Sequence, residues 1–266
     1  QNPAVIAACA LSDKKARDES GEFFFEGIKL LREAKREKLN IVRVFCTESA
    51  ARRYAVELTG DFELIEVSEP VYEKLTSENA PQGVFTIAKK PDIPKKNTGF
   101  SVLLDDVADP GNLGTIIRCA DAFGVEKIYL GGGCADVFNP KTVRAAMGSL
   151  FRVPAERVIL TSAVRTLRAS GYRVYAAMLD EGSESVGEIG KDGKLAVVIG
   201  NEGHGVSAEV RDVCTGSVII PMREDSAESL DNCEMTHGKL IYIAGDGPDG
   251  KGALYNSQDT SKWGAT

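Results

Sequence analysis

At the centre of the chain stands the sequence SVLLDDVADPGNLGTIIRCADAFGV, residues 101–125. An uninterrupted apolar run leads to Asp105 and Asp106, a Pro-Gly turn follows, and apolar residues then recur at helical spacing. We therefore predict a buried strand, a tight turn with Asn112 as the helix N-cap, and a helix over 112–123. A buried strand followed directly by a helix is the repeating unit of parallel α/β sheets.

The same alternation of strands and helices continues on both sides of this unit. Short apolar or alternating runs bounded by turn residues predict strands, and apolar residues at three- and four-residue spacing predict helices. On this basis we predict strands at 42–47, 62–68, 83–89, 127–132, 157–160, 172–178, 195–200 and 217–222. We predict further helices at 22–37, 50–58, 71–75, 141–150 and 162–170. The fold class is therefore α/β, with a mainly parallel sheet in the second half of the chain.

The best candidate for a domain boundary is PDIPKKNTG, residues 91–99, which combines Pro, Lys, Asn and Gly without hydrophobic periodicity. We predict a small α/β domain over 1–93 and a Rossmann-like parallel-sheet domain over 98–245. The remaining residues, 246–266, are rich in Gly, Asp, Ser and Lys and predict an irregular tail. In parallel sheets of this kind, ligands bind beyond the C-terminal ends of the strands.

The charge of the chain limits the partners that it can bind. Its 266 residues carry 32 Lys and Arg against 39 Asp and Glu, and the formal net charge of −7 by itself disfavours nucleic acid. Basic residues nevertheless cluster, since seven Lys or Arg occur from Lys141 to Arg173 against the single acid Glu156. A local basic surface on an acidic protein can still bind phosphates, although any one such charge is more often simply solvated.

Cysteine, histidine and hydropathy patterns exclude several classes of protein. The six cysteines form no CxxC pair and only two histidines occur, which argues against a disulfide framework and against a metal site. No apolar run approaches the ~20 residues of a membrane helix, and AVIAACAL near the N-terminus is too short for a signal peptide. We therefore expect a cytoplasmic enzyme without a metal ion or a membrane segment.

Two further segments carry polar, flexible turns after apolar strands. The first, VVIGNEGHGVSAEV at 197–210, places three glycines within six residues, so that backbone groups can face a ligand. The second, IIPMREDSAESL at 219–230, ends a strand at Pro221 and continues into a polar loop. None of these turns has the G-x-G-x-x-G spacing of dinucleotide-binding folds, which argues against a nicotinamide-dependent oxidoreductase.

Taken in order, three motifs resemble those of the SpoU/TrmH RNA 2′-O-ribose methyltransferases, a branch of the knotted SPOUT superfamily. The motifs are Asn112, Gly114 and Arg118; then Gly200, Glu202, Gly203 and Gly205; then Ile220–Met222 with Glu228–Leu230. The segment NPKTVRAAMGSLFRVP, residues 139–154, is similar to the family's sequence between the first two motifs. The stretch KARDESGEFFFEGIKLLREA, residues 15–34, resembles the small substrate-binding domain that members often carry. The resemblance covers roughly residues 1–242.

The resemblance implies S-adenosylmethionine as methyl donor and a ribose 2′-hydroxyl of RNA as acceptor. It implies a donor site formed by Gly200, Gly203, Ile220, Met222, Leu230 and Asn232. It implies a reacting end formed by Asn112, Arg118, Glu202 and Ser229. The family also implies a C-terminal trefoil knot and a homodimer. The N-terminal domain is related in fold to a ribosomal RNA-binding protein, so the resemblance favours ribosomal RNA over transfer RNA as substrate.

The resemblance leaves two alternatives open. The family assigns Arg118 to the nucleophile, but a guanidinium stays protonated, so Arg118 can instead hold the substrate phosphate while Glu202 acts as the base. After Leu230 the chain reads DNCEMTHG, whereas the family usually continues Asn-Val-Ser-Val-Ala, and Asn232 matches that asparagine only if Asp231 is an insertion. The alternative to an active enzyme is therefore a catalytically impaired homologue that only binds RNA.

Overall fold

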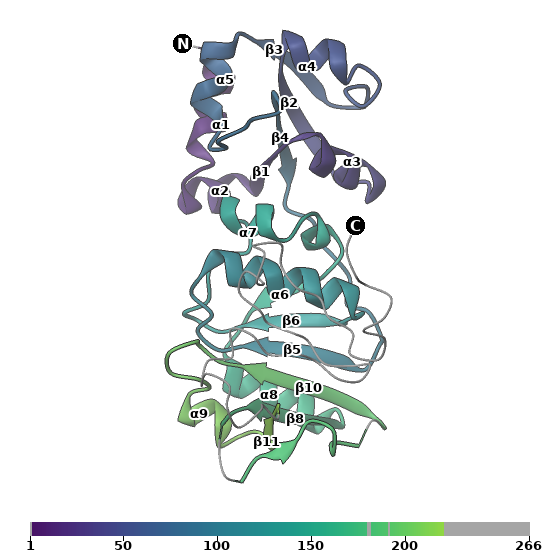
Figure 1. The fold of residues 1–266 in the computed structure, drawn as a ribbon, viewed down its shortest axis with the longest axis vertical. Coiled ribbons are helices and arrows are strands. Elements are labelled where there is room, and N and C mark those ends of the chain that lie inside the picture. Colours follow the sequence, from purple (N-terminus) through teal and green to yellow (C-terminus); the bar gives the residue numbers. More distant parts are fainter. Residues whose placement is uncertain (1, 180–181, 191, 221–266) are drawn as a thin grey trace, which may run out of the picture. The chain divides into compact units, whose positions relative to one another are not determined.

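The structure is a computed structural model that describes residues 2–179, 182–190 and 192–220. Two compact units share these residues (Figure 1). The first unit contains the chain up to Ile93 together with Asp136–Arg152, and the second contains Pro94–Ala135 and the chain from Val153 onward. The predicted knot and the predicted irregular tail concern residues that lie outside the described ranges. Within those ranges, no helix combines the length and the apolar character that a membrane crossing requires.

The first unit is built around a mixed sheet of four strands in the order β1-β4-β2-β3. β4 is antiparallel to both β1 and β2, and β3 is parallel to β2. Its strands are β1 (Glu22–Glu26), β2 (Ile41–Thr47), β3 (Glu63–Val67) and β4 (Val84–Lys89). Its helices are α1 (Pro3–Ala10), α2 (Lys14–Ser20), α3 (Ile28–Arg36), α4 (Glu48–Arg53), α5 (Glu69–Leu75), α7 (Pro140–Ala145) and the 3₁₀ turn η1 (Ser149–Phe151).

Strand β1 is buried on both faces, which explains its sequence EFFFE. Phe24 stacks on Phe85 at 4.7 Å between ring centroids, within a cluster that also includes residues of α1 and α5. Because side chains alternate along a strand, Phe23 and Phe25 point to the other face. There Phe23 packs against Phe138, and Phe25 against Phe151, with centroids 4.9 and 5.4 Å apart. The segment that contains α7 and η1 thus completes the core of the first unit.

The second unit contains seven parallel strands in the order β7-β6-β5-β10-β8-β11-β9. Its strands are β5 (Phe100–Leu104), β6 (Lys127–Leu130), β7 (Ala155–Arg157), β8 (Tyr172–Ala177), β9 (Glu184–Ser185), β10 (Lys194–Ile199) and β11 (Gly216–Ile219). Its helices are α6 (Pro110–Ala122), α8 (Leu160–Ala169) and α9 (Ala208–Arg211). The α/β class with a parallel sheet in the second half of the chain is confirmed.

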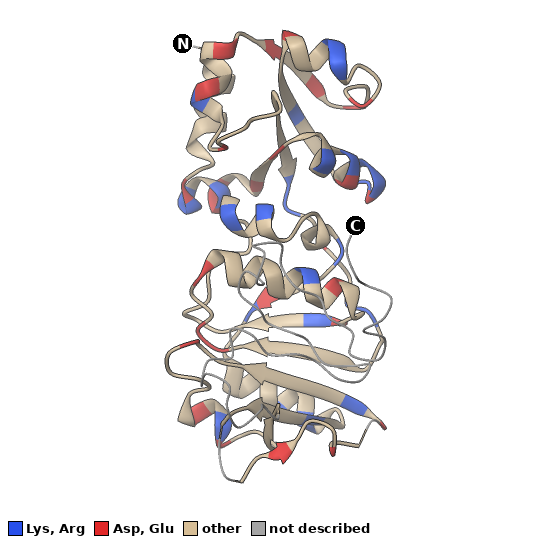
Figure 2. Cartoon of the chain, viewed as in Figure 1, with Lys and Arg blue, Asp and Glu red and all other residues tan. Residues whose placement is uncertain are grey.

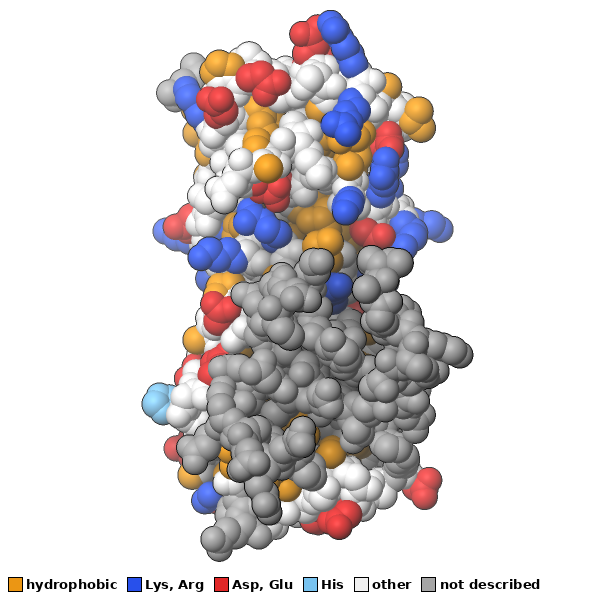
Figure 3. Space-filling view, viewed as in Figure 1, with side chains coloured by type: hydrophobic (Ala, Val, Ile, Leu, Met, Phe, Trp, Pro, Cys, Tyr) orange, Lys and Arg blue, Asp and Glu red, His pale blue; other side chains and the backbone are white. Residues whose placement is uncertain are grey.

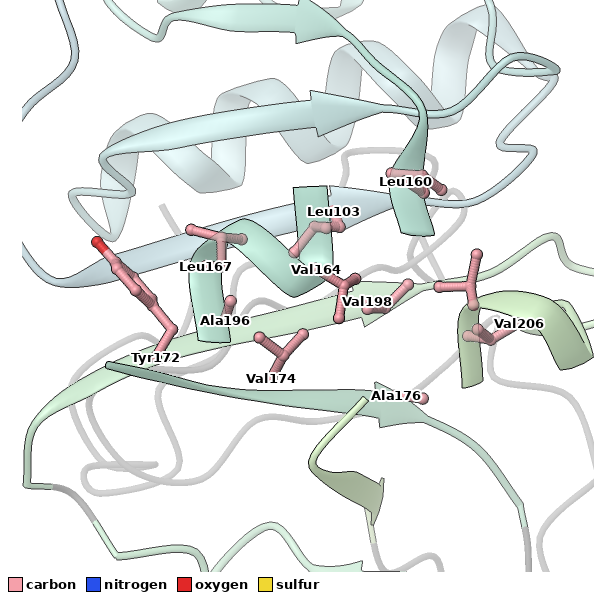
Figure 4. Packing of buried hydrophobic residues seen from close by; sticks show 11 residues of the cluster. Leu103, Leu160, Val164, Leu167, Tyr172, Val174, Ala176, Ala196, Val198 and Val206 are labelled. Carbon is pink, nitrogen blue, oxygen red and sulfur yellow. The ribbon is translucent and has the colours of Figure 1, made fainter. Parts of the chain in front are cut away.

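Helix α8 packs on the centre of this sheet and forms its main apolar core (Figure 4). Val164 and Leu167 of α8 face Val174 and Val198, which belong to the neighbouring strands β8 and β10. Full burial of such a side chain stabilises the fold by about 1.5–3 kcal/mol. Strands covered on both faces need apolar residues at nearly every position, and β5 and β10 are apolar for that reason except at Ser101 and at Lys194, the first residue of β10.

The predicted helix over 22–37 is wrong in its first third. Residues 22–26 form strand β1, Gly27 adopts a φ of 88°, and helix α3 begins only at Ile28. Three consecutive phenylalanines satisfy a helical and a strand pattern equally, and pairing with β4 decides between them. The predicted N-cap is also wrong, because Asp109 caps α6 and its carboxylate accepts the Asn112 N–H at 2.8 Å.

Candidate active site

The parallel order of the sheet brings the predicted motifs to one edge. Strands β5, β10, β8 and β11 are consecutive neighbours, so their C-terminal ends lie side by side. The first motif follows β5 and the second follows β10, and the Asp105 N–H donates to the Ile199 carbonyl at 2.8 Å across this junction. The third motif begins where β11 ends. Such an edge is where ligands of open parallel sheets bind.

Asn112 and Glu202 meet at this edge, although ninety residues separate them in the sequence. The Asn112 side-chain amide donates to the Glu202 carboxylate. Asn112 lies in the first turn of α6, which Asp109 and Pro110 start at a fixed point. Glu202 is exposed on the turn after β10. The structure therefore brings together two of the four predicted residues of the reacting end.

The turn after β10 is a tight loop that folds back on itself. Asn201 and Gly205 pair through both backbone groups, at 3.1 and 2.8 Å. A Cβ at Gly200 would lie 2.0 Å from the carbonyl carbon of Gly205, so only glycine fits there. Gly205 itself has a φ of 66°, which glycine adopts without strain. Gly203 and His204 are exposed at the tip, where backbone groups can face a ligand.

Two clamps that were not predicted hold this loop to the end of β5. The Asp105 carboxylate accepts hydrogen bonds from the Ser207 backbone N–H at 2.8 Å and from its hydroxyl at 2.7 Å. The Asn201 side-chain amide donates to the Asp106 carbonyl at 2.9 Å, and its oxygen accepts the Gly203 N–H at 2.8 Å. Only the local bond from the Gly203 N–H to Asn201 had a sequence signal, because asparagine often binds the backbone two residues on, whereas the other three bonds join residues about a hundred positions apart.

Arg118 is exposed on α6, one turn after Gly114. Gly114 and Ile117 on the same helix are buried, whereas Arg118 is exposed. Its guanidinium is thus presented to solvent, while the direct contact in this region joins Asn112 to Glu202. The predicted role of Arg118 at the reacting end stays a prediction.

The predicted donor-binding residues are only partly within the described structure. Gly200 and Gly203 lie in the folded-back loop, and Ile220 is half-buried directly after β11. The remaining predicted site residues lie outside the described ranges, namely Met222, Ser229, Leu230 and Asn232. Their roles stay predictions.

Two more segments reach the same edge without having been predicted. Leu179 follows β8, whose end lies between those of β10 and β11, and 55% of its surface is exposed. The loop after β6 is fixed by Arg157, which donates to the carbonyls of Gly131, Gly132 and Cys134, each at 2.7 Å. Leu179 and the run of three glycines can be read from the sequence, but only the order of the strands in the sheet places them at this edge.

The edge is acidic and partly apolar, which suits a cationic ligand with an aromatic part. Figure 2 shows acidic residues on the turn after β5, where Asp105 and Asp106 occur. The Glu202 carboxylate adds a third negative charge nearby. Leu179 supplies exposed apolar surface at the same edge. S-adenosylmethionine combines a positively charged sulfonium with an adenine ring, so the described residues fit this donor.

Comparison with known proteins identifies the family of each part. Residues 99–238 match the SpoU rRNA Methylase family, and residues 2–86 match the MRM3-like substrate binding domain. The chain is 34% identical to the 23S rRNA (guanosine(2553)-2′-O)-methyltransferase RlmP of Bacillus subtilis, over 87% of this chain and 92% of that protein. It is 32% identical to the 23S rRNA (uridine(2479)-2′-O)-methyltransferase of Streptomyces viridochromogenes, over 88% of this chain and 86% of that protein.

Solved structures give the same result. An AdoMet-bound rRNA methyltransferase from Sinorhizobium meliloti is 35% identical, with a TM-score of 0.74 over 86% of this chain and 90% of that chain. The SpoU methyltransferase AviRb from Streptomyces viridochromogenes, in complex with AdoMet, is 29% identical, with a TM-score of 0.74 over 86% of this chain and 92% of that chain. The resemblance seen in the three motifs is confirmed, and the chain belongs to the SpoU rRNA methylase family.

Proposed function

We propose that this protein transfers a methyl group from S-adenosylmethionine to a ribose 2′-hydroxyl of ribosomal RNA. The observation that carries the proposal is the junction of the first two family motifs, where Asn112 binds Glu202 beside the folded-back glycine turn. The relatives named as 23S rRNA 2′-O-methyltransferases align over nearly their whole length, which supports the same reaction here. The binding-only alternative is therefore not favoured.

The donor is held mainly by backbone groups of the turns at the sheet edge. Gly203 and Gly205, on either side of His204, carry no side chain at the tip of the second motif, so a ligand can approach their backbone closely. Leu179 and Ile220 provide apolar surface for the adenine. The related methyltransferases from Sinorhizobium meliloti and Streptomyces viridochromogenes were solved in complex with AdoMet, which supports this assignment. Met222, Leu230 and Asn232 complete the pocket in our proposal.

The residues of this chain must position the ribose and remove one proton. When bound, S-adenosylmethionine supplies an electrophilic methyl group on a positively charged sulfur. A bond forms between the 2′-oxygen and the methyl carbon, the carbon–sulfur bond breaks, and its electron pair stays on the sulfur of S-adenosylhomocysteine. Glu202 accepts the hydroxyl proton, and Asn112 holds the Glu202 carboxylate in place. Ser229 contacts the reacting end in our proposal.

In our proposal Arg118 binds a phosphate of the RNA and does not accept the proton of the 2′-hydroxyl. A guanidinium remains charged at physiological pH and presents a planar fork that matches a phosphate. Arg118 is exposed on α6, the helix whose first turn carries Asn112. A phosphate bound there fixes the neighbouring ribose, and correct orientation alone supplies several kcal/mol of the barrier.

The first unit binds RNA through its basic surface in our proposal. Figure 2 marks Lys and Arg positions in blue on α3 and α7, and Figure 3 shows Lys and Arg side chains on this face of the first unit. The basic residues of these helices are Lys29, Arg32, Lys35, Arg36, Lys141 and Arg144. Phosphate contacts by such residues supply most of the sequence-independent affinity for nucleic acid. Local positive charge of this kind reconciles RNA binding with the net charge of −7.

Two further properties belong to the proposal. We expect a homodimer, which sedimentation equilibrium tests through a mass about twice the 28.5 kDa of the chain. We also expect a cytoplasmic location, although mitochondrial rRNA methyltransferases are among the relatives.

The decisive experiment combines donor titration with methylation of ribosomal RNA. We expect calorimetric binding of S-adenosylmethionine and transfer of labelled methyl to a ribose of deproteinised ribosomal RNA. Arg118→Ala should keep donor affinity but lower turnover by about 10²-fold, since phosphate positioning is lost. A folded protein that binds RNA, but that neither binds the donor nor methylates the RNA, would instead establish the binding-only alternative. Unchanged turnover in Arg118→Ala would contradict its assignment.

A further inference from the structure

The end of strand β5 contains a backbone conformation that calls for an explanation. Asp106 has a φ of 59°, in the left-handed region that residues other than glycine seldom adopt. Its side chain lies against Gly133, where an added Cβ would be 1.8 Å from an Asp106 carboxylate oxygen. Gly133 therefore makes room for Asp106 in this conformation. Strained residues of this kind persist when surrounding contacts hold them and tend to gather at functional sites.

The carbonyl group of Asp106 accepts a hydrogen bond from Asn201. Its side-chain nitrogen donates to the Asp106 carbonyl at 2.9 Å, and its side-chain oxygen accepts the Gly203 N–H at 2.8 Å. Its backbone pairs with Gly205 in both directions. One residue thus joins the turn after β5 to the tip of the turn after β10. The next residue along the chain is Glu202, whose carboxylate accepts from Asn112.

We propose that Asn201 is a positioning residue for methyl transfer, acting through the bonds from its amide to the Asp106 carbonyl and the Gly203 N–H. This inference rests on the proposed function. The amide fixes the distance between the two motif turns, and it thereby sets the place of Glu202 and of the exposed backbone around Gly203. Neither bond involves the donor or the RNA, so Asn201 acts through its neighbours.

The two halves of the amide can be separated by substitution. Asn201→Ala removes both bonds. Asn201→Asp keeps an oxygen that accepts the Gly203 N–H, but an ionised carboxylate cannot donate to the Asp106 carbonyl. A protonated carboxylic acid regains an O–H donor in the same place. The matched controls are Asn97→Ala and Asn97→Asp, since Asn97 is an exposed asparagine of the same unit, before β5.

Donor affinity and turnover are measured for each variant from about pH 8 down to about pH 4, which reaches the ordinary aspartate pKa of about 3.9. The neighbouring ionisable residues Asp105, Asp106, Glu202 and His204 are present in every variant, so each value is divided by that of the unsubstituted protein at the same pH. We expect Asn201→Ala to lose about 10- to 100-fold in donor affinity or turnover, with the melting temperature nearly unchanged. We expect Asn201→Asp to match that loss at pH 8 and to recover partly as the pH falls, and both Asn97 variants to stay at the reference value.

Two results would overturn the inference. One is donor affinity and turnover within twofold of the reference in Asn201→Ala. The other is an Asn201→Asp variant that equals the reference at pH 8 or shows no recovery at about pH 4, where the aspartate is partly protonated, since the bond to the Asp106 carbonyl would then have no role. Amide hydrogen exchange of the ligand-free protein separates this failure from failure of the proposed function. Asn201→Ala should speed exchange in peptides covering 199–206 even if the unsubstituted protein binds no donor, and unchanged exchange there would contradict the clamp itself.

Discussion

Gly200 is the residue at which the site depends most directly on the absence of a side chain. Replacing it with alanine places a Cβ 2.0 Å from the carbonyl carbon of Gly205 and 2.3 Å from the Val206 nitrogen. Both obstacles are backbone, so the loop must open rather than a side chain rotate. We expect Gly200→Ala to destabilise the protein by more than the about 1–3 kcal/mol of ordinary overpacking and to weaken donor binding.

Gly182→Ala provides the matched control for this prediction. A Cβ at Gly182 meets nothing within 4 Å, and its backbone does not require glycine. Chemical denaturation and donor titration of the two variants should differ clearly. A Gly200→Ala protein with unchanged stability and donor affinity would show that the loop has another conformation when the donor binds.

At the residue scale, the sequence predicted which residues lie in the site better than it predicted what each of them does. Asn112 and Glu202 were predicted for the site, and they meet there. Asn112 was also predicted as the cap of α6, a role that belongs to Asp109. Both residue types cap helices well, and the choice depends on where Pro110 begins the helix. Asn201 was overlooked because its bonds reach the Asp106 carbonyl, ninety-five residues away in the sequence.

Among the elements, the start of β5 is secured by a buried carboxylate outside the active site. Glu126 is 1% exposed and accepts from the Ser101 hydroxyl at 2.9 Å, from the Gly99 N–H at 3.0 Å and from the Tyr172 hydroxyl. Lys95 adds an ion pair at 2.8 Å. Burial by itself raises the pKa of Glu126, but these bonds outweigh it, so the pKa lies below its ordinary value.

This lowered pKa makes a signed prediction about acid stability. The stabilisation by ionised Glu126 is present above the unfolded-state pKa, about 4.3 for glutamate, and is lost as the pH falls through the lower folded-state pKa. Glu126→Gln should cost about 1–3 kcal/mol at neutral pH, because the amide keeps only one acceptor oxygen, sets an NH2 donor against the Gly99 N–H and loses the ion pair with Lys95. It should also flatten the decline in unfolding free energy below about pH 4. Equal slopes of stability against pH in both proteins would contradict this account.

The segment Asp136–Arg152 is the element whose packing partners were not predicted from the sequence. It was predicted inside the parallel-sheet domain, yet it packs in the core of the first unit. The Arg17 guanidinium, 2% exposed, binds the Asp136 carboxylate at 2.7 Å and the Leu11 and Ser12 carbonyls. Local periodicity predicted helix α7 but contains no information on which sheet covers it, because that depends on contacts far apart in sequence.

Arg17→Met tests how firmly this segment is held. Removing one partner of a buried ion pair leaves the other uncompensated and typically costs about 3–5 kcal/mol. We expect a clear loss of stability and faster proteolysis within 136–152. Arg36→Met is the control, since Arg36 is 60% exposed and its pairs with Glu33 and Glu37 should contribute within about 1 kcal/mol. Equal stability of the two variants would mean that the Arg17 contacts hold nothing in place.

For the whole molecule, the order of motifs along the chain predicted the class of fold and the family, while the division into units was only partly predictable. The continuous apolar run LAVVI predicts a strand that is buried on both faces, as in a parallel sheet. The linker at 91–99 was visible from its prolines and polar residues. The return of 136–152 to the first unit was not, because its aromatic partners Phe23 and Phe25 lie more than a hundred residues earlier.

This division leads to a prediction about how the donor stabilises the molecule. A ligand that binds only the folded state at 100 times its dissociation constant adds about 2.7 kcal/mol to the stability of the structure that holds it. The predicted donor residues lie in the second unit. Hydrogen exchange with saturating S-adenosylmethionine should therefore slow most in peptides of 100–104, 172–177 and 194–205. Peptides of 136–152 should instead follow those of 22–47, although the chain enters and leaves this segment from the second unit. If 136–152 gained the same protection as 100–104, the two units would unfold as one cooperative body, and the prediction would be wrong.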